Sequence, residues 1–212
     1  MSPLLQYRNI TISGLPGSGP PPPPPALRDH PTLTFDSWSG FSGGEYMRDY
    51  ASQKGLLDAN GKLHHTANAY PEDFDREVDM SMRTRLQKEN HWILESWLSG
   101  FFAQGVDGVL KVLMMCSNTA VRVDRIVNRD QVTADEALDN MNHRYKTNSA
   151  KWRKMYKQEW HDWVVATGTF DESDPIDFWH PDLYDIVIDT YSTNQVEAVD
   201  LVINAISTKK TA

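Results

Sequence analysis

Residues 7–19 read YRNITISGLPGSG, and this stretch decides the fold that we predict for the chain. Its first part, residues 7–13, alternates apolar and polar side chains, which is typical of a short strand. The strand runs directly into GLPGSG. A strand followed by GxxxxG is how a phosphate-binding loop begins, because the backbone N–H groups of such a loop converge on phosphate oxygens. We therefore expect four residues of the loop to bind phosphate: Gly14, Gly17, Ser18 and Gly19.

Six consecutive prolines, Pro20 to Pro25, follow the loop and stand where the full motif has Lys and then Ser or Thr. Each proline ring fixes φ and lacks an N–H. The run therefore predicts polyproline II or extended chain, no helix behind the loop, and weak nucleotide binding. Since GxxxxG alone is a weak signal, a Gly-Pro turn that leads into a flexible linker is the alternative interpretation.

The rest of the chain alternates predicted strands with predicted helices. The strands are expected at residues 33–38, 91–95, 109–116 and 184–189. The helices are expected at residues 43–54, 71–88, 117–128, from 133 onwards and from 192 to 206. Two capping boxes support the later helices, one from Thr133 to Glu136 and one from Ser192 to Gln195. This order predicts an α/β fold with a parallel sheet covered on both faces.

Composition narrows the possible functions. The chain has 212 residues with 21 basic and 29 acidic side chains, a net charge of −8. That balance argues against broad nucleic-acid binding. The single cysteine, Cys116, excludes a disulfide framework and a thiolate zinc cluster. No stretch of about eighteen apolar residues could span a membrane, and the first residues lack the apolar run of a signal peptide. We therefore predict a cytoplasmic protein without membrane contact.

Further motifs follow the loop in a fixed order. They are FSGGEYMRDYASQKG at 41–55, DFDREVDM at 73–80, WILESWLSGFFA at 92–103, RVDRIVNRDQVTADEALDNMNHRYKTNSAKWRKMY at 122–156 and LYDIVIDT at 183–190. Together they resemble the cytidylate kinases of the archaeal type, in the nucleoside monophosphate kinase superfamily. The resemblance covers nearly the whole chain and implies a three-layer P-loop kinase fold, with a five-stranded parallel sheet, helices on both faces and a helical lid.

The resemblance also implies how the chain is organised and what it does. It implies one domain over 1–212, with a core of 7–42, 89–130 and 182–207, a monophosphate-binding insert at 43–88 and a lid at 131–181. The implied reaction is ATP + CMP (or dCMP) ⇌ ADP + CDP (or dCDP), with Mg²⁺ as the cofactor of ATP. The implied partners are ATP and a pyrimidine nucleoside monophosphate, and the expected state is a monomer.

The insert carries the expected acceptor site. Arg48 follows a Ser-Gly-Gly turn at the start of a predicted helix, a suitable clamp for a monophosphate; an exposed helix cation is the alternative. Asp75 and Asp79 share a helix face, from which Arg76 is expected to point away. A solvated acidic face is the alternative there. By resemblance the residues that bind CMP are Gly43, Gly44, Arg48, Asp75, Arg76 and Asp79.

Glu95 ends a predicted strand, the place where parallel sheets put functional carboxylates. By resemblance Glu95 would hold Mg²⁺ through water, and the alternative is a helix cap. Trp97 and Ser149 depart from the family pattern, because the related enzymes have arginines at both positions. An indole cannot neutralise phosphate, which makes the affinity for CMP or the choice of acceptor uncertain.

Residues 140–158 contain six cations and no acid, against the negative charge of the whole chain. Such a segment suggests a polyanionic ligand, and a solvated face is the alternative. Before it, Arg122, Arg125 and Arg129 form one stripe of a predicted helix. By resemblance Arg125 and Arg129 would bind the phosphates of ATP, and lid closure would bring three catalytic residues onto the transferred group: Arg144, Lys146 and Lys151.

Three rival interpretations stay open. The first is a pseudokinase or scaffold of the same fold that cannot hold ATP. The second is that the proline run is a polyproline ligand for grooves of the SH3, WW or profilin type. The third is that the run is not part of the natural sequence.

Overall fold

The middle of the molecule is a five-stranded parallel sheet, seen in a computed structural model that describes residues 5–19, 24–34, 36–47 and 72–207. The strand order is β2-β3-β1-β4-β5. The strands are β1 (Asn9–Gly14), β2 (Ser39–Ser42), β3 (Trp92–Glu95), β4 (Val109–Met115) and β5 (Ile186–Asp189). The predicted α/β fold with its five-stranded parallel sheet is therefore confirmed, and β1 with its following loop is central.

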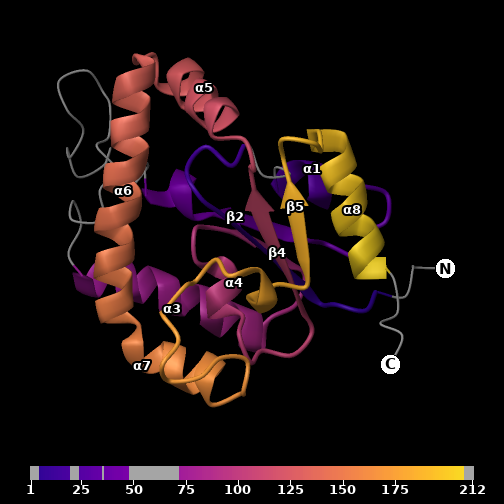
Figure 1. Cartoon of the computed structure of the whole chain (residues 1–212). Coiled ribbons are helices and arrows are strands. Elements are labelled where there is room, and N and C mark those ends of the chain that lie inside the picture. The colour runs from indigo at the N-terminus through magenta and orange to yellow at the C-terminus, as the bar shows by residue number, and fades with distance from the viewer. Residues whose placement is uncertain (1–4, 20–23, 35, 48–71, 208–212) are drawn as a thin grey trace.

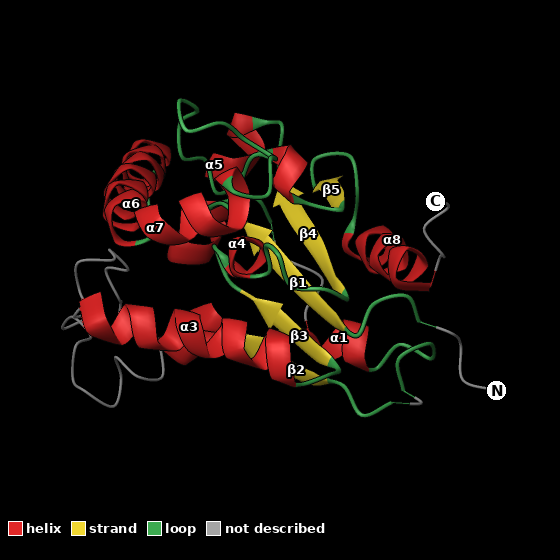
Figure 2. Ribbon diagram, turned by 90° about the horizontal axis from the view of Figure 1, so that it is seen from below, coloured by secondary structure: helices red, strands yellow, loops and turns green. Residues whose placement is uncertain are grey.

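Helices cover both faces of the sheet, which gives three layers (Figures 1 and 2). On one face lie α1 (Pro24–Arg28) and α8 (Gln195–Ser207). On the other lie α3 (Glu72–Lys88), α4 (Ser99–Phe102) and α7 (Lys157–Trp160). Each face has its own hydrophobic core. None of the described helices is both long and apolar enough to cross a lipid bilayer.

Two further helices lie beside the sheet. The helix α5 (Thr119–Asp130) follows β4, and α6 (Ala134–Met155) runs back from it towards α7 (Figure 1). A small core of Ile126, Ala137 and Met141 joins α5 to α6. A π-helical turn at His161–Val165 and a 3₁₀ turn at Pro181–Leu183 precede β5. The α5–α6 pair therefore lies next to the carboxyl ends of the strands, where the loop after β1 is also found.

Apolar and polar side chains alternate along β1, and both sets are buried. Ile10 and Ile12 pack against α1 and α8 on one face of the sheet. The side chains on the opposite face are small and polar, so a helix can lie close to the strand there. One of them, Ser13, accepts a hydrogen bond from the N–H of Gly100 at 2.8 Å. A Cβ at Gly100 would lie 2.3 Å from the ring of Tyr184, so glycine is required there. The result is a short α4 seated directly on the central strand.

Two predicted boundaries are wrong. The strand expected at 33–38 is a turn region, because Leu33 and Asp36 donate to carbonyls only three residues earlier. Leu33 lies in this turn and Trp38 lies directly before β2, and because both are buried they give a strand-like pattern. The second box, predicted from Ser192 to Gln195, is formed instead by Asn194 and Glu197, whose side chains each bond the other's backbone N–H. The box of Thr133 and Glu136 is confirmed.

The proline run does not exclude a helix. Pro24 and Pro25 form the first turn of α1, and the N–H of Asp29 donates to the carbonyl of Pro25 at 2.8 Å. Proline is tolerated there because the N–H groups of a first turn have no partner within the helix. The prediction that no helix follows the loop is therefore wrong. Pro20 to Pro23 lie outside the described residues.

Candidate active site

The glycine loop after β1 is a tight turn with little free space. Gly17 and Gly19 have φ angles of 76° and 97°, which favour glycine. The N–H of Ser18 donates to the carbonyl of Leu15 at 3.0 Å, and Ser18 itself is buried. A Cβ at Gly17 would lie 2.8 Å from the carbonyl oxygen of Arg122. Both glycines are thus required by the shape of the loop, as the motif predicts.

Side chains from two distant elements hold the loop by its carbonyl oxygens. Arg122 of α5 donates to the carbonyl of Pro16 at 2.9 Å through Nη2. Arg125, one turn later, donates to the carbonyl of Gly17 at 3.4 Å. The Thr190 hydroxyl, after β5, donates to the carbonyl of Ser18. Three consecutive carbonyl groups of the loop are therefore bound by side chains from other elements.

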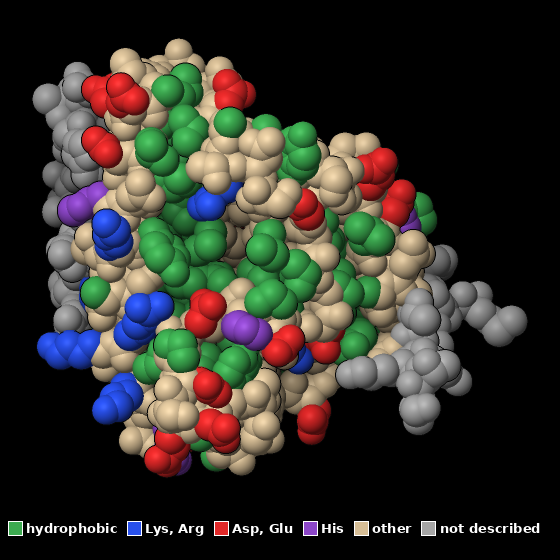
Figure 3. All heavy atoms as spheres, in the orientation of Figure 1, with side chains coloured by type: hydrophobic (Ala, Val, Ile, Leu, Met, Phe, Trp, Pro, Cys, Tyr) green, Lys and Arg blue, Asp and Glu red, His purple; other side chains and the backbone are tan. Residues whose placement is uncertain are grey.

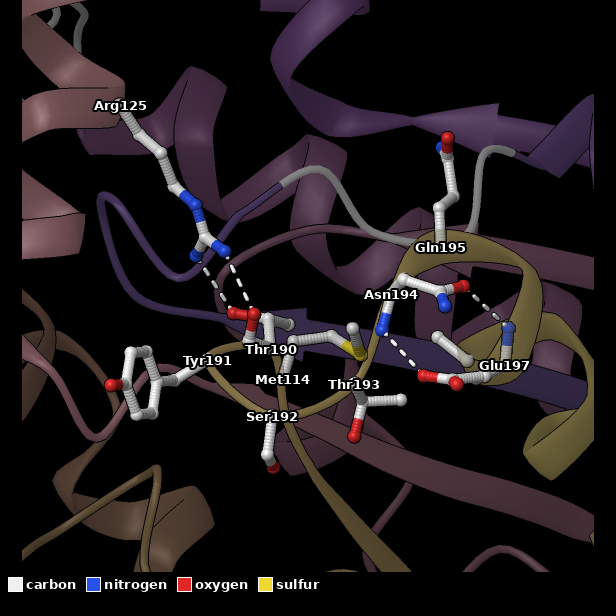
Figure 4. Close-up of a pocket in the computed structure, with 10 residues that line it drawn as sticks. Met114, Arg125, Thr190, Tyr191, Ser192, Thr193, Asn194, Gln195 and Glu197 are labelled. Atoms are coloured by element: carbon white, nitrogen blue, oxygen red, sulfur yellow. Dashed lines mark hydrogen bonds between the residues drawn. The ribbon is translucent and has the colours of Figure 1, made fainter.

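A pocket of about 440 Å³ opens beside the loop (Figure 4). Arg125 reaches into it from α5 and donates to the hydroxyl and the carbonyl of Thr190, both at 2.8 Å. Asn194 and Glu197 bond each other on its other side. The full lining is Met114, Arg125, Thr190 to Gln195, Glu197 and Ala198. Sequence reasoning missed this pocket, although the polar run between the last strand and the last helix was a usable signal.

Two more arginines lie where α5 meets α6. Arg129 pairs with Asp130 through two hydrogen bonds of 2.6 and 2.7 Å. Arg144, on α6, lies over the ring of Trp97 with its Cζ 5.3 Å from the ring centroid. Burial, and secondly the charge of Arg129, lower the pKa of Arg144 to about 10. Clustered guanidinium groups of this kind are suited to a polyanion.

Glu95 lies at the end of β3, directly beside β1. Its Oε2 accepts a hydrogen bond of 2.6 Å from the Ser42 hydroxyl at the end of β2. Gly43 is buried next to this pair, where a Cβ would lie 3.0 Å from the Cβ of Ser96, and Gly44 is exposed. Glu95, Gly43 and Gly44 are therefore brought together at the carboxyl edge of the sheet. Arg48 lies outside the described residues.

The side chains at the carboxyl edge of the sheet decide whether Mg²⁺ could bind there. Within the described ranges, no three metal-ligating side chains of His, Cys, Asp or Glu lie together. Mg²⁺ needs no such cage, since it keeps several waters and is held by one or two carboxylates together with substrate phosphates. A single carboxylate, Glu95, paired with the strand that leads into the glycine loop, fits that mode of binding.

Asp75, Arg76 and Asp79 of α3 all contact the end of α6 and the start of α7. Lys151 Nζ lies 2.8 Å from Asp75, and the Tyr156 hydroxyl donates to Asp79 at 2.5 Å. Arg76 pairs with Glu159 and also lies over the Tyr156 ring. The prediction that Arg76 points away from the two acids is wrong. Its long side chain lies over the ring of Tyr156, whose hydroxyl also binds Asp79. These three pairs join the predicted insert to the predicted lid.

The three predicted catalytic residues have different surroundings on α6. Arg144 lies against Trp97, Lys146 is exposed, and Lys151 is 6% exposed in its pair with Asp75. The face shown in Figure 3 is hollowed between α6 and the sheet, and hydrophobic side chains surround the hollow. Lys and Arg side chains gather along the α6 side of this face, and acidic side chains gather over α7 and the loop after it. The basic segment therefore does form one border of a recess.

The buried Asp79 carboxyl should make stability depend on pH. Burial raises the pKa of Asp79 from 3.8 to about 7, so the folded state favours the protonated carboxyl. The stability that this carboxyl contributes is fully present below the pKa it has in the unfolded chain, and it is lost as the pH rises towards its folded pKa of about 7. Thermal unfolding should therefore show that Asp79→Asn stabilises the protein more at about pH 7.5 than at about pH 4.5. Asp73→Asn, on the exposed face of α3, is the matched control. An equal effect of Asp79→Asn at both pH values would contradict the shift.

Comparison with known proteins identifies a family and a shared fold. No family model matches the chain. The cytidylate kinase of Methanosarcina acetivorans is 29% identical over 193 residues, 91% of this chain and 92% of that protein. The cytidylate kinase of Methanosarcina barkeri is 30% identical over 193 residues, with the same coverage. An uncharacterized protein from Eubacterium ventriosum shares the fold, with a TM-score of 0.56 and 17% identity over 95% of this chain and 99% of that one. The chain belongs to the cytidylate kinase family.

Proposed function

We propose that this protein transfers the γ-phosphoryl group of Mg²⁺-bound ATP to CMP or dCMP, and so forms ADP and CDP or dCDP. The observation that carries the proposal is the rigid glycine loop after β1, held by α5 and by Thr190 and flanked by a pocket and by Glu95. Membership of the cytidylate kinase family supports the class of reaction. Beyond that class, we propose ATP as the phosphoryl donor and a pyrimidine nucleoside monophosphate as the acceptor.

On the donor side, the loop would bind the phosphates of ATP through Gly14, Gly17, Ser18 and Gly19. Arg125 belongs to both the loop and the pocket, because it contacts the carbonyl of Gly17 and lines the cavity. A nucleotide with its phosphates at the loop would therefore place its nucleoside in the pocket, against the Arg125 guanidinium. Arg129, farther along α5, would add positive charge near the phosphates.

On the acceptor side, residues 43–88 would hold the nucleoside monophosphate. Gly43 and Gly44 lie beside Glu95, so an acceptor phosphate bound there would lie close to the metal carboxylate. Arg48 would clamp that phosphate. Asp75, Arg76 and Asp79 would face the base and the ribose from α3. In the arrangement seen, these three residues also connect α3 to α6 and α7.

The chemistry needs little covalent help from the protein. An oxygen of the acceptor phosphate attacks the γ-phosphorus, and the bond from that phosphorus to the β–γ bridging oxygen breaks, so that ADP leaves. When bound, Mg²⁺ would neutralise charge on the phosphates, and Glu95 would hold it through water. Arg144, Lys146 and Lys151, on the lid of residues 131–181, would stabilise the negative charge of the transferred group and exclude water.

A coupled assay of ADP release tests this proposal. With ATP and Mg²⁺, CMP and dCMP should be phosphorylated faster than AMP. Arg144→Met should lower kcat by about a hundredfold or more, because cations on the transferred phosphoryl group are worth at least that much. Lys154→Met, at an exposed position on the same helix, should leave kcat unchanged. Tight binding of ATP and CMP without any ADP release would indicate a binding protein and contradict the proposal.

A further inference from the structure

Trp97 has a fixed position at the carboxyl edge of the sheet. The N–H of Ser96 and the hydroxyl of Ser99 both donate to the carbonyl of Ile12 in β1, at 3.1 and 2.9 Å. The indole N–H of Trp179 donates to the carbonyl of Trp97 at 2.8 Å. The backbone around Trp97 is therefore bound to the strand that carries the glycine loop.

The ring of Trp97 is held as firmly as its backbone. It makes edge contacts with the rings of Trp152 and Trp179, with centroids 5.3 and 6.1 Å away and interplanar angles of 70°. The indole N–H of Trp152 is buried and has no hydrogen-bond partner in the described part of the chain, so packing alone places that ring. These contacts fix the plane of the Trp97 ring, over which a cation lies.

That cation is Arg144. Its Cζ lies 5.3 Å from the Trp97 ring centroid, within the range of a cation–π contact. Burial and the nearby charge of Arg129 both disfavour the charged guanidinium. A π face offsets part of this cost, and it does so most strongly where water is excluded. The contact also joins the predicted lid to the rigid edge of the sheet.

A neighbouring position on α6 fits the same arrangement. Ser149 is 2% exposed, and its hydroxyl has no hydrogen-bond partner among the residues that the structure describes. It lies three residues before Trp152, on the same side of α6. Trp97 contacts the ring of Trp152, and Ser149 is buried one turn before Trp152 on α6.

We infer that Trp97 is a positioning residue, whose indole holds the Arg144 guanidinium of α6 against the carboxyl edge of the sheet. This inference rests on the proposed function, in which Arg144 acts on the transferred phosphoryl group. In this chain a ring fixed to the sheet orients an arginine from α6. Trp97 therefore contributes to catalysis without touching phosphate.

Substitutions of Trp97 can show whether its ring positions Arg144 or only packs against its neighbours. Trp97→Leu removes the π face and should lower kcat about tenfold or more, the loss expected for a desolvated cation–π contact, while KM for ATP and CMP stays within about twofold. Trp97→Phe keeps a weaker π face and should recover part of kcat. Trp163→Leu is the matched control, because Trp163 also lies under an arginine, with Arg83 Cζ 3.6 Å from its centroid, but belongs to the packing against α3. This control should leave kcat unchanged.

Two further measurements decide the inference. In the Arg144→Met background, Trp97→Leu should cause no additional loss of kcat. In the unmodified protein, NMR should show ring-current shifts for the Arg144 side-chain protons that Trp97→Leu abolishes. If the losses of kcat in the double variant are additive, or if the Arg144 protons of an active enzyme are unshifted, the role of Trp97 is wrong while the proposed function stands. A wild-type chain without transferase activity would instead overturn the proposed function, and the catalytic role of Trp97 with it.

Discussion

Exchanging Lys151 for methionine should lower the free energy of unfolding by about 3–5 kcal/mol, the usual cost of breaking a buried ion pair from one side. Lys151 Nζ and the Asp75 carboxylate are 2.8 Å apart, and their side chains are only 6% and 10% exposed. Methionine keeps the length and apolar stem of lysine but removes the charge. The Asp75 carboxylate then stays buried without this cation. Denaturant titration followed by circular dichroism measures the change.

Two variants show whether the effect belongs to the ion pair. Lys146→Met, at an exposed position on the same helix, should change stability by less than about 0.5 kcal/mol. Lys151→Met combined with Asp75→Leu should recover most of the loss, because an apolar pair of similar size is often as stable as a buried ion pair. A loss below about 1 kcal/mol for Lys151→Met alone would show that the pair is solvated, as surface pairs are.

Gly17→Ala should weaken ATP binding by about a hundredfold or more, the scale on which a displacement near 1 Å disturbs a preorganised site. The added methyl group would lie 2.8 Å from the Arg122 carbonyl oxygen and 3.0 Å from the Arg122 Cβ. Both atoms belong to α5, whose backbone cannot yield without moving a whole helix. The loop must yield instead, and the backbone N–H groups that we propose to bind phosphate move with it. Calorimetric titration with ATP measures the loss.

Gly105→Ala separates this crowding from backbone strain. Gly105 also has a positive φ of 68°, but a Cβ there would meet nothing within 4 Å. Alanine at Gly105 should therefore destabilise the fold by about 1–2 kcal/mol and leave ATP affinity unchanged. Equal ATP affinity in Gly17→Ala and the wild type would show that the glycine loop does not hold the phosphates.

Local patterns in the sequence predicted most of the fold. The apolar strand β4, the amphipathic helix α3 and the capping box at Thr133 each depend on residues close in sequence, and each was predicted within a few residues. The strand expected at 33–38 failed because buried side chains in a turn can mimic strand alternation. The prediction that no helix follows the loop was wrong because position within a helix, and not proline content, decides whether proline is tolerated.

The candidate site could be predicted only in part. The glycine loop and the end of β3 are local motifs, and sequence reasoning found both. The groups that hold the loop come from Arg122 and Thr190, more than a hundred positions away in the sequence, so no local pattern indicates them. No local pattern indicates the contact of Trp97 with Arg144 either. The resemblance implied only that Trp97 stands where an arginine is expected. The π face that replaces it becomes visible only when α6 packs against the sheet.

The first and last described segments meet on one side of the molecule. The N–H of Gln6, just before β1, donates to the carbonyl of Ile206 in α8 at 2.9 Å. A domain that the chain enters and leaves at neighbouring points can be inserted into another protein, or cut and rejoined in a new order, without moving any strand. This architecture therefore suits insertion into a surface loop of a host domain, where both ends of the inserted segment must lie close together.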